Sequence, residues 1–484
     1  MGRTHVPTLA LLALLASCAL GPKTPAPDTR LPAAFDAPVG AAAGGAWMDR
    51  WWSQYNDPQL EALVDQALAT APDARSARAR LDEALAVRSS ALAAYDPQGA
   101  VQANGAASET KVLSGGTLVI PGDKGPPVSF TNSGWSTSKT ANFDVSWELD
   151  LFGRRAAARR KANADLAAAR FDYAATRASL AANVADSLFQ ARGLAIQLQD
   201  AHETERLQRD LADVARKKAA HGLGTSADAD QADAQTALSA AQAADLESQL
   251  HAARRTLLVL VGRGGDPLTS LPAPPTAGAP PPVPASVPGE LLARRPDVRE
   301  SAARLRSATG QLALDELALF PKFTLSPGVG LTSSTGGFAP TTSDIWSIGL
   351  GLAQPVLDLP RLKAEIRAQG ARSDQAVIAY EKTVQTAYGE AENALVALGS
   401  DEARIKLLVT GEAQARRAYD AARNGYAAGV SDLTAVLTAE RTWRAARTAL
   451  TGAQVQALRR SVQAFKALGG GWSPAALAIA ETSR

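Results

Sequence analysis

Several residue types and patterns are scarce in this 484-residue chain, and each scarcity excludes a class of structure or function. Cys18 is the only cysteine, so no disulfide can form within the chain. The formal net charge is only +2, whereas proteins that bind nucleic acid usually carry a concentrated basic surface. No uninterrupted apolar run reaches the roughly 18 residues that a transmembrane helix needs.

Catalytic and metal-binding patterns are missing as well. The four histidines, His5, His202, His221 and His251, lack metal-ligand spacing. The chain has neither a phosphate-binding loop nor a nucleophile elbow. We therefore expect a protein that is not an enzyme and that uses no cofactor or metal.

The first residues have the pattern of an export signal. Arg3 and His5 precede an apolar run at residues 9–15, and Leu15-Ala16-Ser17-Cys18 resembles the bacterial lipobox. Cleavage there would remove residues 1–17 and leave a lipidated, palmitate-bearing Cys18 at the start of a tether over residues 18–46. The following Ala19 differs from the aspartate that retains lipoproteins in the inner membrane, so the resemblance implies sorting to the outer membrane. An ordinary signal peptide is the alternative.

A strand that leads into a very long helix is the main structural signal. Residues 142–150 alternate apolar and polar side chains, which predicts a β-strand with one apolar face. The next 68 residues, 154–221, contain no proline and 21 alanines, which predicts one helix. At about 1.5 Å per residue such a helix would run roughly 100 Å, far more than a compact domain needs.

The chain repeats this pattern. Residues 71–75 and 94–97 return 224 positions later, and Gly193 returns as Gly399. Each copy is predicted to contain a helix, two strands, a long helix, a tight turn and a return helix, with the second long helix over residues 361–425. We predict a first repeat at residues 47–265 and a second at 289–472, followed by a tail at 473–484. Residues 266–288 hold nine prolines and are predicted to be an extended connector.

The strand count constrains the assembly. Four strands cannot close a membrane barrel, for which about eight is the minimum, so two copies would give eight strands and three would give twelve. A soluble sandwich of two hairpins is the alternative. The long helices have narrow apolar seams and polar remaining surfaces, which suits either the wall of a water-filled tunnel or a solid coiled-coil stalk.

These features together resemble the outer-membrane efflux protein family, the TolC-like outer-membrane factors, in the lipoprotein branch that serves resistance-nodulation-division pumps. The matching motifs follow one another along essentially the whole mature chain. They are Leu15–Cys18, Trp51-Trp52, Asp57-Pro58, Leu60, Trp147–Arg154, Arg294–Val298, Phe320-Pro321, Tyr426–Gly429 and Gly469–Trp472.

The resemblance implies an α+β membrane protein and an exit duct for drugs or other toxic small molecules. Three protomers would share a 12-stranded barrel in the outer membrane and continue it as a helical tunnel across the periplasm, in contact with lipid, a periplasmic adaptor and an inner-membrane pump. A duct for type I protein secretion and a non-conducting periplasmic scaffold are the alternatives. The sequence names neither the exported compound nor the pump.

The two helix turns are the candidate functional sites. Glycine there permits a positive φ, and Ser226 and Ser431 are predicted to cap the return helices. The resemblance implies that these turns form the periplasmic end of the tunnel and contact the adaptor, through Leu223, Gly224, Thr225, Ala428, Gly429 and Val430. We name Asp432, Tyr426 and Arg423 as gate candidates, joined by a Tyr426–Asp432 or an Arg423–Asp432 contact.

Overall fold

The computed structural model describes residues 24–36, 46–111, 116–118, 128–130, 134–283, 286–336 and 340–473. Cys18 and residues 474–484 of the predicted tail lie outside these ranges. Contacts divide the chain into two compact units. The first contains Leu85–Asp165 and Leu305–Ala376, and the second contains Ala26–Ala84, Leu166–Arg304 and the chain from Val377 onward.

The predicted duplication is confirmed element by element. The two copies contain a leading helix of 22 residues, a long helix of 67 or 69 residues and a return helix of 35 residues. In the first copy these are α3 (Pro72–Ala93), α4 (Arg154–Ala220) and α5 (Ser226–Leu260). In the second copy they are α7 (Pro296–Leu317), α8 (Leu359–Ala427) and α9 (Leu433–Ala467).

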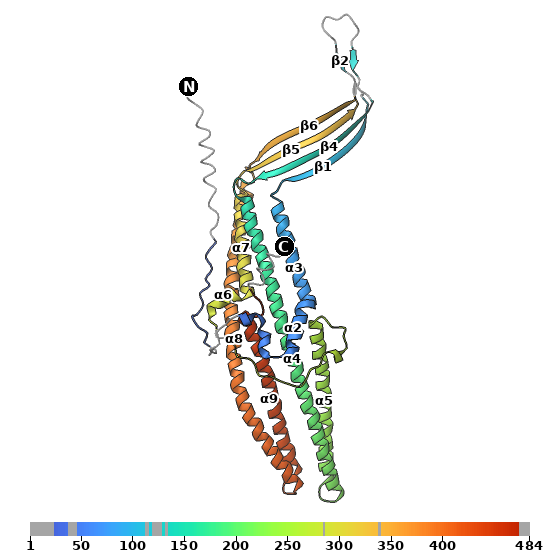
Figure 1. Cartoon of the computed structure of the whole chain (residues 1–484), viewed down its shortest axis with the longest axis vertical. Coiled ribbons are helices and arrows are strands. Elements are labelled where there is room, and N and C mark those ends of the chain that lie inside the picture. The colour runs from blue at the N-terminus through green and yellow to red at the C-terminus, as the bar shows by residue number, and fades with distance from the viewer. Residues whose placement is uncertain are drawn as a thin grey trace. The chain divides into compact units, whose positions relative to one another are not determined.

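One antiparallel sheet of four strands lies in the first unit, in the order β1-β4-β5-β6 (Figure 1). Its strands are β1 (Gln98–Thr110), β4 (Gly134–Leu149), β5 (Lys322–Thr335) and β6 (Thr341–Ala353). A two-stranded sheet of β2 (Gly116–Leu118) and β3 (Val128–Phe130) lies between β1 and β4 in the chain. β1 has 13 residues although its sequence alternates only weakly, and it pairs with β4 along its whole length.

The sheet has an exposed apolar face in the single chain. Trp346, Ile348 and Leu350 alternate along β6, so they point to one side, and each is more than two-thirds exposed. A face of this composition needs a cover other than water.

Arg154, at the start of α4, joins the sheet to the helices of the first unit. Its guanidinium donates to Glu148 Oε1 at 2.9 Å and to the carbonyl oxygens of Leu317 and Phe320 at 2.8 and 3.0 Å. Phe152 packs against Phe320, with ring centroids 5.1 Å apart. The end of β4 is therefore tied to the end of α7, which belongs to the other copy.

A large buried cluster of the second unit contains several aromatic rings among Leu, Val and Ala side chains. The 3₁₀ segment η1 (Ala46–Tyr55) and helix α2 (Pro58–Thr70) bring Trp51 onto Phe465 of α9, with stacked rings 5.6 Å apart. Both rings are fully buried. Asp57 caps α2 by accepting from the backbone N–H groups of Gln59 and Leu60, and it also pairs with the buried Arg192 of α4. We call the buried residues around Trp51 and Phe465 the aromatic core.

The proline-rich segment lies between the two copies in the chain. Its described residues contain no α-helix, only the 3₁₀ turns η2 (Leu268–Ser270) and η3 (Pro288–Glu290) before the short helix α6 (Leu291–Arg294). Arg254 of α5 holds this segment by donating to the carbonyl oxygens of Leu268 and Leu271.

The described part of the predicted tether lies on α8. The backbone N–H of Asp28 donates to Glu381 at 2.7 Å, and that of Asp36 donates to Glu392 at 3.1 Å. Between these bonds, Phe35 is buried and stacks on Tyr388. This non-helical segment is therefore fixed to one helix by polar and aromatic contacts.

Two helical hairpins complete the second unit, α4 with α5 and α8 with α9 (Figure 1). Among the described helices, none has the length and apolarity that crossing a bilayer requires.

Candidate functional site

The turn of the first hairpin is closed by its own backbone. Gly222 has a φ of +68°, and the backbone N–H of Leu223 donates to the carbonyl oxygen of Lys218 at 2.8 Å. Thr225 and Asp228 then form a reciprocal capping box at the start of α5. The predicted cap at Ser226 is therefore wrong by one residue, since the side chain of Thr225 reaches the backbone N–H three positions later.

The second turn uses different chemistry at the same place. Gly429 has a φ of +76°, and Asp432 caps α9 by accepting from the backbone N–H of Ala435 at 2.7 Å. Ser431, the predicted cap, instead donates its hydroxyl to the carbonyl oxygen of Ala422 on α8 at 3.0 Å. The carboxylate is the stronger acceptor for a backbone N–H, and the hydroxyl is left to close the turn.

The predicted adaptor-contact residues lie at the surface of the two turns. Leu223 is 77% exposed and Val430 is 83% exposed. The other four, Gly224, Thr225, Ala428 and Gly429, are exposed as well. Each turn thus presents one large apolar side chain among small residues, a combination that fits a protein partner.

Lys218 and Tyr426 join the ends of the two long helices. The Lys218 ammonium donates to the carbonyl oxygen of Tyr426 at 2.8 Å and lies 3.7 Å from the centre of its ring. Tyr426 is only 8% exposed. Burial raises the pKa of the Tyr426 hydroxyl, and the negative charge of Asp228 adds to this effect. The contact links the first hairpin to the second through neighbouring turns.

The three gate candidates take separate positions. Tyr426 binds Lys218, whereas the side chain of Asp432 bonds to Ala435 of its own helix, and Arg423 is exposed. Within the described chain, neither Tyr426 nor Arg423 hydrogen-bonds to Asp432. Sequence reasoning missed Lys218, because nothing in a lysine near a helix end points to a tyrosine 208 residues later.

A compact group behind the turns, the tip cluster, packs all four helices together. Its buried members are Ala212, Ala215, Ala232, Tyr419, Tyr426, Leu433, Val436, Leu437 and Trp443. Tyr419 of α8 stacks on Trp443 of α9 with centroids 5.1 Å apart, and Trp443 donates its indole N–H to Glu412. Small residues come from the first hairpin and large ones from the second.

Arginines of α9 continue the contact between the two hairpins beyond the tip cluster. We call this contact surface between the hairpins the seam. Arg447 pairs with Asp200 of α4, and Arg459 pairs with Asp186 of the same helix. The hydrogen bonds that both guanidinium groups donate to these carboxylates raise the pKa of each guanidinium group. Arg441 and Arg444 donate to the amide oxygens of Gln235 and Gln242 on α5. Polar contacts therefore connect α9 to both helices of the first hairpin.

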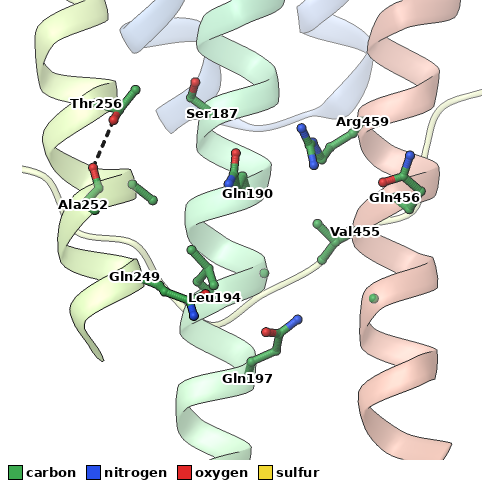
Figure 2. Close-up of a pocket in the computed structure, with 13 residues that line it drawn as sticks. Ser187, Gln190, Leu194, Gln197, Gln249, Ala252, Thr256, Val455, Gln456 and Arg459 are labelled. Carbon is green, nitrogen blue, oxygen red and sulfur yellow. Dashed lines mark hydrogen bonds between the residues drawn. The ribbon is translucent and has the colours of Figure 1, made fainter. Parts of the chain in front are cut away.

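A polar groove lies farther along the seam, between α4, α5 and α9 (Figure 2). It has a volume of about 470 Å³, and its lining includes Gln190, Gln197, Gln249, Gln456 and Arg459. At one wall α4 and α9 approach closely, because a Cβ on Gly193 would lie 2.7 Å from a methyl carbon of Val455.

Comparisons with known proteins identify the family of this chain. The model of the outer membrane efflux protein family matches residues 63–263 and 287–470. The chain is 30% identical to the pyoverdine export outer membrane protein OpmQ of Pseudomonas aeruginosa, over 98% of each chain. It is 29% identical to the antibiotic efflux pump outer membrane protein ArpC of Pseudomonas putida, over 95% of this chain and 94% of that one.

Solved structures of outer-membrane channels have the same fold as this chain. The outer-membrane channel OprN superposes with a TM-score of 0.77 at 29% identity, over 93% of this chain and all of that one. The outer-membrane channel CmeC of Campylobacter jejuni shares the fold, with a TM-score of 0.82 at 20% identity. The resemblance, the fold class and the location inferred from sequence are confirmed, and the family is one of channels rather than of enzymes. The chain belongs to the outer membrane efflux protein family, and it is the outer-membrane channel component of an efflux system.

Proposed function

We propose that this chain is the passive duct of a tripartite system, filled through a periplasmic adaptor by an inner-membrane resistance-nodulation-division pump. The observation that carries this is the continuity of each strand pair into a helix of 67 or 69 residues, which joins a sheet with an exposed apolar face to long polar hairpins. The relatives are named for export of pyoverdine and of antibiotics, so small organic molecules are the proposed cargo.

A homotrimer in the outer membrane is the proposed assembly. β1 and β6 are the edge strands of the four-stranded sheet, and unpaired backbone groups are not tolerated in lipid. Pairing β6 of one copy with β1 of the next removes all edges when the ring closes. Three copies of four strands supply twelve, which exceeds the minimum of about eight.

The two turns are the proposed docking points for the adaptor. Leu223 and Val430 would each enter an apolar recess between adaptor helices, while the flanking glycines let the backbones approach. The proposed closed state is held next to these turns, where Lys218 contacts Tyr426. Asp432 would act on this gate by fixing the start of α9, and Arg423 by its exposed charge.

Lipidation is proposed at Cys18, on the sequence pattern alone. Replacing Cys18 with serine should abolish palmitate labelling of the exported protein. Labelling that persists in Cys18→Ser would contradict the assignment.

Conductance in planar bilayers tests the duct. The purified full-length protein should show rare openings alone and larger, longer ones when the adaptor is added. Permanent absence of conductance, even with the adaptor, would favour the scaffold. A channel that passes an unfolded polypeptide but no small organic ion would favour the protein-secretion duct.

A further inference from the structure

Gln208 of α4 and Glu440 of α9 meet inside the seam between the two hairpins. They are 1% and 2% exposed. The Gln208 amide donates from Nε2 to Oε2 of Glu440, and this is a direct bond from the first hairpin to the second. Glu440 lies eight residues beyond the cap Asp432, so it is about 12 Å along α9 from the turn.

Two oxygen atoms of this pair have no hydrogen-bond donor. Among the described residues, Oε1 of Gln208 and Oε1 of Glu440 are both buried and without a hydrogen-bond partner. A carboxylate only accepts hydrogen bonds, so an ionised Glu440 cannot satisfy the amide oxygen. Two unsatisfied acceptors in one buried pair are unusual, because buried polar groups are almost always bonded.

One added proton would supply the hydrogen-bond donor that these two acceptor oxygens lack. We propose that Gln208 and Glu440 form a proton-binding site, in which neutral Glu440 donates from Oε1 to Oε1 of Gln208 while Gln208 donates from Nε2 to Oε2 of Glu440. This reciprocal acid–amide pair uses the donor that the buried atoms lack. It would hold α4 to α9 just behind the turns.

The surroundings favour the neutral acid. Burial raises the pKa of Glu440, against the opposing effects of the Gln208 hydrogen bond and of the positive charges on Arg444 and Arg441. Arg444 Nη1 lies 3.6 Å from Oε1 of Glu440, but the same guanidinium donates to Gln242 of α5, and Arg441 donates to Gln235. The arginines are thus shared with the first hairpin.

Other charged and titratable groups face the site from the packed helices. Burial raises the pKa of Tyr419 of α8; the charge of Arg423 opposes this, and the charges of Glu440, Asp420 and Asp210 add to it. Glu412 of α8 accepts from Trp443, and Asp233 of α5 pairs with Arg216 of α4. On the α5 side the groups that hold Arg441 and Arg444 are the neutral amides of Gln235 and Gln242.

The sign of the pH effect follows from the raised pKa. The closed seam binds a proton more tightly than an open, hydrated one, so its extra stability is complete below the ordinary pKa of 4.5 and is lost as pH rises through the raised value. This regulation rests on the proposed function, in which the closed state is held next to the turns, so that opening would separate the two hairpins there. Mild acidity should therefore favour closure.

Glu440→Gln is the decisive variant, because a second amide can make the same reciprocal pair without a proton. Infrared spectra of the full-length protein should show a protonated carboxyl group at about pH 5 that Glu440→Gln lacks. The matched control is Glu412→Gln, which alters another carboxyl of the same seam and should keep that signal. An identical signal in wild type and Glu440→Gln would overturn the proposal.

Channel recordings measure how protonation of Glu440 changes the open fraction of the channel. Between about pH 5 and pH 8 the wild-type open fraction should rise, by about tenfold for each pKa unit that separates the closed and open states. Glu440→Gln should stay closed and flat with pH, and a wild-type slope in that variant would contradict the coupling. Gln208→Met is the second variant, expected to keep the carboxyl signal but shift its frequency. A channel that never conducts would disprove the duct and leave the infrared test intact.

Discussion

The aromatic core and the tip cluster belong to the same unit but are built differently. In the aromatic core, large rings from distant parts of the chain stack with no exposed surface, as Trp51 does on Phe465. In the tip cluster, alanines of α4 and α5 meet large side chains of α8 and α9. Separating a helix face of alanines from larger side chains exposes less apolar surface than separating two stacked aromatic rings.

The arginines near the aromatic core are also more buried than those along the seam. In the region of the aromatic core, Arg192 and Arg295 are less than a tenth exposed and bond to Asp57 and to Asp297 with Glu390. Along the seam, Arg447 and Arg459 are a third or more exposed, so water can replace their partners at little cost. The contacts of the aromatic core are therefore costlier to break than those at the hairpin ends, as the proposed gate requires.

Removing the Trp51 ring should strongly destabilise the aromatic core. Trp51→Ala leaves a large cavity against Phe465 and should lower the free energy of unfolding by about 3–5 kcal/mol. Thermal unfolding of the purified protein in detergent measures the loss. Leu223→Ala, at an exposed position, should change the midpoint little, and equal losses in both variants would contradict the comparison.

Asp57 tests whether the core depends on its buried ion pair. Burial alone would raise the pKa of Asp57, but the hydrogen bonds from Arg192 and from the backbone of Leu60 outweigh it and lower the pKa. The stability it contributes is therefore present above its ordinary value of 3.8 and is lost as pH falls through the lowered one.

Asp57→Ala should cost about 3 kcal/mol, because Arg192 then stays buried without its carboxylate. Asp57→Asn keeps an acceptor for the cap and separates the two roles. Urea unfolding at neutral pH compares them, and a cost in Asp57→Asn as small as a few tenths of a kcal/mol would mean that the charge matters little.

Lys218→Met should affect opening more than unfolding. The variant removes a hydrogen bond and a cation–π contact that together contribute about 1–3 kcal/mol to the closed state of each protomer. The open fraction in planar bilayers should rise at least tenfold. Lys217→Met is the matched control, and a similar rise in that variant would point to net charge rather than to the Tyr426 contact.

Asp432→Ala should have a smaller effect than Lys218→Met. Loss of the cap destabilises the start of α9 by about 1 kcal/mol, and the open fraction should rise less than in Lys218→Met. Asp228→Ala, which removes only one half of the capping box on α5, should do still less. Conductance and permeability to large antibiotics give the order, and a larger rise for Asp432→Ala would place the gate at that carboxylate.

Long-range organisation was predictable because its signals are long. The proline-free runs fixed two helices to within two residues at either end, and matching motifs such as Gly193 and Gly399 identified the two copies. The helix caps were misplaced by one residue, since Thr225 and Asp432 compete locally with the adjacent serines for the same backbone N–H groups.

The contacts between the two hairpins could not be predicted from the sequence, for a physical reason. An alanine-rich helix has no broad apolar stripe, so periodicity does not tell which face meets the neighbour. Lys218 with Tyr426, and Gln208 with Glu440, depend on that rotation and lie 208 and 232 residues apart. Each residue alone is ordinary on a polar helix.

The docking of residues 28–36 on α8 also sets the order in which the chain can mature. The partners of Asp28 and Asp36 lie 353 and 356 residues later, so roughly four-fifths of the chain must be synthesised and exported first. Until then Phe35 has no Tyr388 to stack on, and the segment is open to chaperones and proteases. Protection of the beginning of the chain therefore reports that the second long helix has arrived.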